Sequence, residues 1–122
     1  MATKSIQRSL KLIKGYEWQY WITEKWNAYT RRREDMFNFC DILCLDGKRT
    51  IAVQATGSDL AKHRDKLKEN PFVLPWLTAN NELQIWSFRK LKKVRCKKAT
   101  YWHCKKTDVL LVNNEIFMEE RK

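Results

Sequence analysis

Asp41 is the most informative residue of the sequence because it stands inside an apolar run, residues 39–45. Aspartate is rare in β-strands, and a carboxylate buried without a partner is costly. A metal ion is one partner that would balance its charge. The alternative is an aspartate on the solvated face of a half-buried strand, but its neighbours on both strand faces are apolar. We therefore expect Asp41 to belong to a functional site.

Gln54 is the polar residue that a hairpin would bring closest to Asp41. Asp46-Gly47 indicates a turn between strands predicted over residues 36–45 and 50–56. With a loop of two or four residues, Asp41 and Gln54 lie opposite or diagonal on one face, within about 5–8 Å. A loop of three residues would place them on opposite faces.

Two glutamates are candidates to complete an acidic cluster with Asp41. Residues 9–29 carry apolar side chains at three- and four-residue steps, which predicts a helix, or two helices divided at Gly15. Glu17 and Glu24 are two helical turns apart and would share one face of that helix. Simple solvation is the ordinary alternative for both, and it is the favoured one for Glu17.

The residues around Asp41 and Gln54 resemble a known family. The segments RRREDMFNFCDIL (residues 31–43) and IAVQATG (residues 51–57) look like the PD-(D/E)XK nuclease superfamily. The nearest likeness is to small phage-type proteins related to Holliday junction resolvases and restriction endonucleases. The resemblance covers about residues 16–90. It implies an α/β, restriction-endonuclease-like fold with a three-layer core, in which helices flank a central mixed sheet.

The resemblance also implies a metal-dependent reaction. Asp41 would be the principal ligand of Mg²⁺ or Mn²⁺, Gln54 would contribute its amide oxygen, and Glu24 would be the acid from the first helix. Such an ion polarises a scissile phosphate and activates water. Mg²⁺ prefers oxygen ligands and is commonly held by one or two carboxylates together with a substrate phosphate.

Thr56 departs from the family pattern, because it stands where the superfamily usually has a lysine. A hydroxyl cannot supply the positive charge that stabilises the transition state. Either the cation has moved to Lys62 or Lys66, of which Lys66 fits the family-like spacing better, or catalysis has been lost. His63 between them is a proton-shuttle candidate, although a histidine beside an apolar stripe is more often structural.

The elements that must position these residues follow from local signals. Ser58 is a favourable N-cap for a helix that Asn70-Pro71 ends. Residues 72–77 predict a short turn or helix, residues 83–88 a strand, and residues 100–104 and 109–112 two further short strands. This order indicates a layered α/β fold with a central sheet, in one domain that spans the 122 residues.

The charge of the chain indicates a polyanionic partner. Lys and Arg total 25 against 14 Asp and Glu, which gives a formal net charge of +11. Residues 89–106 form a basic C-terminal strand and loop region with nine Lys or Arg and no acid, interrupted or flanked by aromatic residues. A solvated face is the alternative, but we favour nucleic acid, and DNA in particular, bound in a salt-dependent way. The predicted nucleic-acid-binding residues are Arg31, Arg32, Arg33, Lys62, Arg64, Arg89, Lys90, Lys92 and Lys93.

Other classes of protein are disfavoured. Residues 1–15 lack the apolar core of a secretory signal, and no window reaches the roughly 18 apolar residues of a membrane span. We expect a cytoplasmic location, in the host if the protein is viral. The four cysteines lack metal-knuckle spacing, so we expect buried thiols rather than a zinc site.

The sequence therefore predicts a Mg²⁺-dependent endonuclease that acts on DNA, with branched DNA among its candidate substrates. Symmetric cutting of a junction would require a homodimer. A module of the same fold that binds nucleic acid without catalysis is the first alternative, and Thr56 supports it. A phage interaction or inhibitor protein, with its basic face on an acidic protein surface, is the second.

Overall fold

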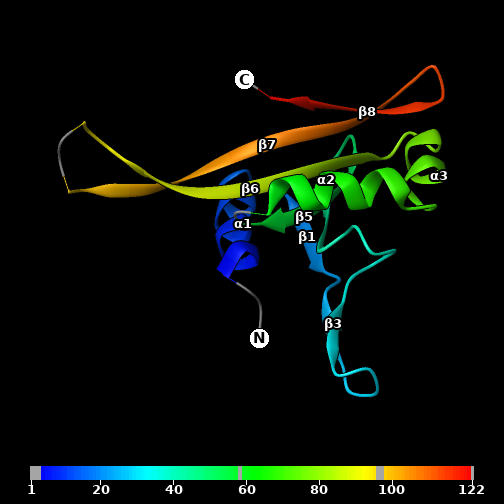
Figure 1. Ribbon diagram of the computed structural model, residues 1–122, viewed down its shortest axis with the longest axis horizontal. Helices are drawn as coiled ribbons and strands as arrows, with labels where there is room; N and C mark the ends of the chain where they lie inside the picture. Colours follow the sequence, from blue (N-terminus) through cyan, green and yellow to red (C-terminus); the bar gives the residue numbers. More distant parts are fainter. Residues whose placement is uncertain (1–3, 58, 96–97, 122) are drawn as a thin grey trace.

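The computed structural model describes residues 4–57, 59–95 and 98–121. The chain begins with a helix and three short strands, continues through a β-hairpin and two helices, and ends in three further strands (Figure 1). In chain order the elements are α1 Lys4–Gly15, β1 Gln19–Ile22, β2 Lys25–Asn27, β3 Arg32–Glu34, β4 Ile42–Leu45, β5 Thr50–Thr56, α2 Leu60–Glu69, α3 Val73–Thr78, β6 Glu82–Lys92, β7 Thr100–Val112 and β8 Glu115–Glu120.

Six of the strands form one mixed sheet in the order β1-β4-β5-β6-β7-β8. The β5–β6 pair is parallel, and the other neighbouring pairs are antiparallel. Parallel neighbours need a crossover connection, which α2 and α3 supply here. Strands β2 and β3 pair separately as a small hairpin. The protein is thus an α/β structure with a large mixed sheet, as the sequence predicted.

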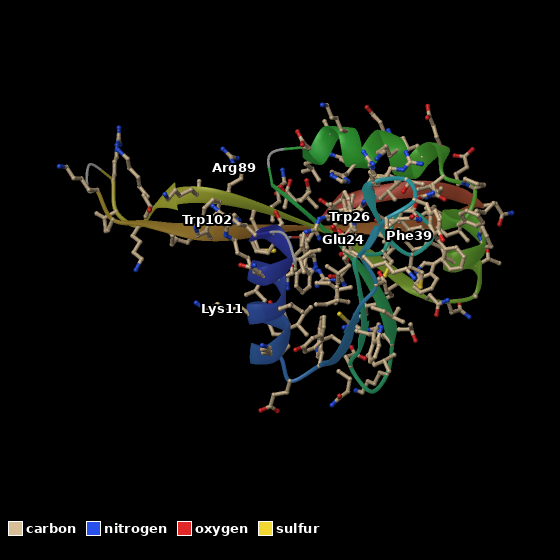
Figure 2. The ribbon with its side chains drawn as sticks, turned by 90° about the horizontal axis from the view of Figure 1, so that it is seen from below. Lys11, Glu24, Trp26, Phe39, Arg89 and Trp102 are labelled. Atoms are coloured by element: carbon tan, nitrogen blue, oxygen red, sulfur yellow. The ribbon has the colours of Figure 1, made fainter. Side chains whose placement is uncertain are left out.

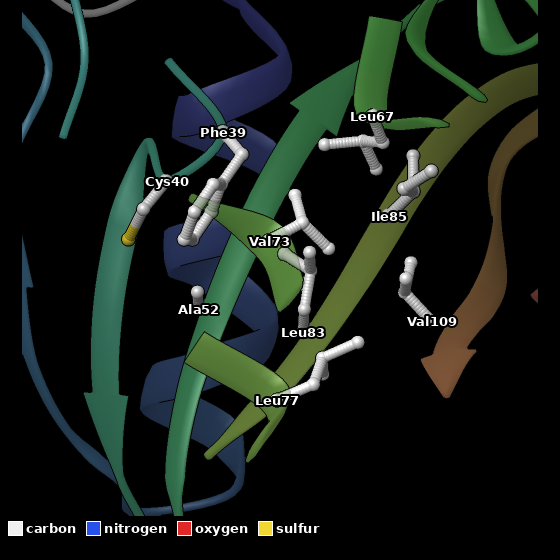
Figure 3. Close-up of a cluster of buried hydrophobic side chains, with 9 residues drawn as sticks. All are labelled: Phe39, Cys40, Ala52, Leu67, Val73, Leu77, Leu83, Ile85 and Val109. Carbon is white, nitrogen blue, oxygen red and sulfur yellow. The ribbon is translucent and has the colours of Figure 1, made fainter. Parts of the chain in front are cut away.

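Two apolar clusters lie on the sheet because side chains alternate between its faces. On one face, Leu67 of α2 and Val73 of α3 pack with Ala52, Ile85 and Phe39 (Figure 3). The cluster of the other face consists of Ile6 and Ile13 of α1 with Ile42, Cys44, Ile51, Val53, Trp86 and Phe88. Helices therefore cover both faces of the central strands.

The hairpin has the four-residue loop, since Leu45 pairs with Thr50. The Asp46 carboxylate accepts hydrogen bonds from the backbone N–H groups of Lys48 at 2.8 Å and Arg49 at 2.7 Å, which closes the turn. Gly47 has a φ of +93°, a conformation that glycine adopts without strain. The predicted helix after the hairpin is confirmed as α2, while its proposed N-cap, Ser58, lies outside the described residues.

The predicted helix over residues 9–29 is wrong in its second half. Helix α1 ends at Gly15, and Glu17 takes a left-handed φ of +62°. Residues 19–22 instead form β1, where Tyr20 pairs with Cys44 of β4. The sequence Gln-Tyr-Trp-Ile is rich in strand-forming residues, and its pairing with β4 favours the strand over a helix.

Other boundaries also differ from the prediction. The strand predicted from residue 36 begins only at Ile42, because Phe37 and Asn38 have positive φ values of +55° and +63° and make a tight turn. The two strands predicted in residues 100–112 are the single strand β7. Strand β8 was not predicted, although Asn113-Asn114, both with positive φ, is a typical hairpin turn.

Strands β6 and β7 continue beyond the rest of the sheet. Pairing of β5 with β6 ends at Thr56 and Ser87, whereas β6 and β7 stay paired to Lys92 and Thr100. The resulting two-stranded ribbon reaches away from the body (Figure 1). We call its residues 89–92 and 100–104 the basic arm. Over the part of the chain that the structure describes, no helix is long and apolar enough to cross a membrane.

Candidate active site

A cavity of about 700 Å³ lies between the hairpin strands, the β2–β3 hairpin and one flank of α2. All four residues predicted to be catalytic line it, which are Glu24, Asp41, Gln54 and Lys66. They come from the loop after β1, the position before β4, the middle of β5 and the flank of α2. The fold therefore brings together residues that are far apart in the sequence.

Asp41 is held firmly at the entrance to β4. Its side chain is only 8% exposed, and its Oδ2 accepts a hydrogen bond of 2.8 Å from the backbone N–H of Ala55. Burial is the main cause that raises the pKa of Asp41 to about 8, against the opposing effect of the Ala55 hydrogen bond. The nearby carboxyls of Asp35 and Glu24 raise the pKa further. The site thus favours the protonated form of Asp41 at neutral pH.

Gln54 offers an oxygen without a partner. The residue is 5% exposed, and among the described residues its buried Oε1 accepts no hydrogen bond. A buried acceptor left unpaired costs about 1–3 kcal/mol. Gln54 lines the cavity beside Asp41, so an unpaired acceptor belongs to the same site as the buried carboxylate.

Glu24 reaches the site by a different route from the predicted one. It lies in the loop between β1 and β2, not on a helix. The backbone N–H groups of Thr23 and Glu24 both donate to the carbonyl of Asp41, at 2.9 and 3.3 Å, and the Thr23 hydroxyl donates to the carbonyl of Cys40. The Glu24 carboxylate forms an ion pair of 3.3 Å with Arg33. Pairing of β1 with β4 is what places Glu24 beside Asp41.

Asp35 is a site residue to which the sequence analysis gave no role. It follows β3 and lines the cavity. A side-chain hydrogen bond joins the Asp35 and Asp41 carboxyl groups, and it lowers the pKa of Asp35 and raises that of Asp41. Burial raises the pKa of Asp35, while the charges of Lys66 and His63 oppose that shift. The only sequence signal was its place in the segment that resembles the nuclease superfamily.

Lys66 and His63 project from one flank of α2, three residues apart. Lys66 places a positive charge in the cavity. Burial, and then the charge of Lys66, lower the pKa of His63. The His63 Nδ1 is buried and has no hydrogen-bond partner among the described residues. Thr56 is buried and is not among the residues that line the cavity.

The predicted nucleic-acid-binding residues separate into three groups. Arg32 and Arg33 line the cavity, whereas Arg31 takes a left-handed φ of +55° at the hairpin turn. The group on α2, Lys62 and Arg64, lies outside the cavity, and Arg64 lines a separate shallow hollow. The group on or beside the basic arm is Arg89, Lys90, Lys92 and Lys93.

The cysteines do not form a cluster. Cys40 and Cys44 are buried and Cys104 is half-buried, all as free thiols, while Cys96 lies outside the described residues. Within residues 4–57, 59–95 and 98–121, no three His, Cys, Asp or Glu side chains are arranged as a preformed metal centre. A metal at the cavity would therefore depend on the Gln54 amide oxygen in addition to carboxylates.

Comparisons with protein-family models, with curated proteins and with solved structures gave no significant match.

Proposed function

We propose that the protein is a metal-dependent endonuclease that hydrolyses phosphodiester bonds in DNA, with an active site of the PD-(D/E)XK type. The observation that carries the proposal is the unpartnered, buried Gln54 Oε1 in the same cavity as Asp41. Helices on both faces of a mixed sheet are compatible with a restriction-endonuclease-like fold. The basic arm and the net charge of +11 favour a nucleic-acid substrate.

The donor set suits Mg²⁺ or Mn²⁺. Asp41 and Gln54 would hold the ion through a carboxylate and an amide oxygen, with Asp35 and Glu24 as additional carboxylates in the cavity. Bound there, the ion would supply Lewis-acid activation of the phosphate and of a water molecule.

The remaining residues of the cavity have roles that follow from their charges. Arg32 and Arg33 would attract and orient the phosphate backbone, since guanidinium groups match phosphate oxygens in pairs. Lys66 would replace the lysine that the superfamily usually has at the position of Thr56. Its charge would stabilise the negative charge that develops on the phosphate in the transition state. The Ala55 N–H fixes the orientation of the Asp41 carboxylate, which lines the cavity.

A cleavage assay tests the proposal. Labelled single-stranded, duplex, flapped and four-way-junction DNA, with RNA alongside, are incubated with Mg²⁺, Mn²⁺ or EDTA. We expect cutting in either metal and none in EDTA or with Asp41→Asn. Binding without cutting in every metal, unchanged by Asp41→Asn, would contradict the proposal and identify a non-catalytic binding module, which Thr56 would then explain.

Lys66→Met is expected to lower the cleavage rate by about 10²–10³-fold while leaving the fold intact, because it removes the positive charge from the cavity but keeps a long apolar stem. Lys66→Arg should retain part of the activity. Lys62→Met is the matched control, since Lys62 is exposed on the same helix and does not line the cavity. Equal losses for the two methionine variants would mean that only the overall charge of α2 matters.

A further inference from the structure

A second cavity, of about 630 Å³, lies where β5 ends and the basic arm begins. Arg8 of α1 and Leu60 of α2 line two of its sides, and β6 and β7 line the rest. The ladder between β5 and β6 stops at Thr56 and Ser87, so β6 continues past the end of β5. The cavity occupies the space beyond the end of this pairing. The Ser87 hydroxyl donates a 2.9 Å hydrogen bond to the carbonyl of Gly57, which holds the residue that follows β5 against β6.

The charged side chains that line this cavity are all positive among the described residues. Arg8, Arg89, Lys90 and Lys105 contribute four cations, and no acidic side chain is among the described residues that line it. The four cations come from α1, β6 and β7. Arg8 and Lys90 lie at the Trp102 ring, whereas Arg89 and Lys105 belong to the other face of the ribbon. Lys105 is also ion-paired with Glu120 at 3.2 Å. A ligand that fits here carries negative charge.

Trp102 supplies an aromatic surface in the same place. The side chain is 46% exposed and pairs across the ribbon with Lys90. The guanidinium carbon of Arg8 lies 3.4 Å from the centre of the Trp102 ring, and the Lys90 Nζ lies 5.8 Å from it. Figure 2 shows Trp102 and Arg89 near the point where the ribbon leaves the body, on opposite sides of the ribbon and apart from Glu24. An exposed indole among cations is the combination that stacks a nucleobase and neutralises its phosphate.

The two cavities are neighbours along β5. Ala55 lines the first cavity and Gly57 lines the second. Two residues of extended chain span about 7 Å. A nucleic-acid strand bound in the first cavity would need to cross only this distance to enter the second. A base can lie flat on an indole only when it is unstacked from its own duplex, so the subsite selects an unpaired strand.

We propose that the second cavity is a subsite for one unpaired nucleotide, with its base stacked on Trp102 and its phosphate between Arg8 and Lys90, the two cations beside that ring. The inference rests on the proposed function and extends it, because it names single-stranded DNA, or the unpaired strand of a branched DNA, as the substrate class.

The experiment is a double-mutant cycle between protein and ligand, in EDTA so that no cleavage occurs. A labelled oligothymidylate and an abasic deoxyribose-phosphate oligomer of the same length are titrated with the wild type, Trp102→Ala and Trp102→Phe, and binding is followed by fluorescence anisotropy. Removing the bases should weaken binding by the wild type about tenfold more than binding by Trp102→Ala. Trp102→Phe should keep most of that base dependence. Trp21→Ala is the matched control, because Trp21 is 75% exposed on β1, away from the arm.

The possible results separate the two proposals. If Trp102→Ala weakens both oligomers equally, Trp102 only anchors the arm to α1, and the subsite is contradicted while the nuclease proposal stands. If the wild type binds neither oligomer nor duplex DNA at low salt, both are contradicted. The affinities of each variant for the two oligomers are compared with each other. A variant that only loosens the basic arm weakens binding of both oligomers, so it does not give the expected result.

Discussion

Asp41→Asn should abolish metal-dependent cleavage and, at neutral pH, make the fold more stable. The loss of activity, on the order of 10³-fold, follows from removing the charged ligand from the cavity. The gain in stability follows because asparagine imitates the protonated acid. Its amide oxygen can accept from the Ala55 N–H, and its amide N–H can donate to Asp35.

The sign of the pH dependence follows from the pKa of Asp41, which burial raises from 3.8 to about 8 in the folded protein. A raised pKa contributes stability that is fully present below pH 3.8 and is lost as the pH rises through about 8. Between these two pH values, the free energy of unfolding falls by about 1.4 kcal/mol per pH unit. The melting temperature of Asp41→Asn, relative to wild type in EDTA, should therefore be higher at pH 7.5 than at pH 5.

Two further measurements make this prediction specific. Mg²⁺ should raise the melting temperature of the wild type at pH 7.5 and leave that of Asp41→Asn unchanged, because only the folded wild type holds the ion. Asp46→Asn is the control in the same hairpin. There, hydrogen bonds from Lys48 and Arg49 lower the pKa of the Asp46 carboxyl to about 2, so its replacement should not stabilise the fold or reduce cleavage. Parallel pH profiles for wild type and Asp41→Asn would show that Asp41 is ionised in the folded protein.

Trp86→Ala should cost about 3–5 kcal/mol of unfolding free energy, a large part of the 5–15 kcal/mol typical of a domain. Trp86 is fully buried, and its ring centroid lies 6.2 Å from that of Trp18 and 6.4 Å from that of Tyr16. Its indole N–H donates a 2.8 Å hydrogen bond to the buried Oε1 of Gln84. The substitution therefore opens a cavity under α1 and leaves an amide oxygen unpaired.

Urea denaturation measures this effect. Trp86→Phe should lie between wild type and Trp86→Ala, because it fills part of the space but cannot donate to Gln84. Trp21→Ala, at an exposed position of β1, should change the unfolding free energy by about 0.5 kcal/mol or less. A small effect at Trp86 would mean that the cluster beneath α1 contributes little to the stability of the sheet.

The parts of the fold that the sequence predicts are those governed by local chemistry. Asp46-Gly47 and the alternation around it predict the hairpin. They place Asp41 and Gln54 on one face only for a loop of two or four residues, and the structure has the loop of four. Asn70-Pro71 predicts the end of α2, and the spacing on that helix predicts that Lys66 is available to the site.

The parts that could not be predicted depend on contacts between distant segments. Residues 16–29 have apolar spacing that suits a helix, but β1 forms because β4 offers an edge to pair with. Glu24 is therefore at the predicted site through strand pairing rather than through a helix. Asp35 belongs to the cavity because the turn at Phe37 and Asn38 folds it back towards Asp41, and two consecutive left-handed residues are not evident from the sequence.

The buried thiol of Cys40 makes local opening of this site measurable through its rate of alkylation. Cys40 directly precedes Asp41, and burial is the main cause that raises its pKa to about 12. Since only the thiolate reacts with alkylating reagents, Cys40 is inert at neutral pH while the strand stays closed. Cys44, whose pKa burial also raises to about 12, lies within β4, whereas Cys40 belongs to the turn before that strand. The ratio of alkylation at the two thiols therefore distinguishes opening of the turn that carries Asp35 and Asp41 from unfolding of the whole sheet.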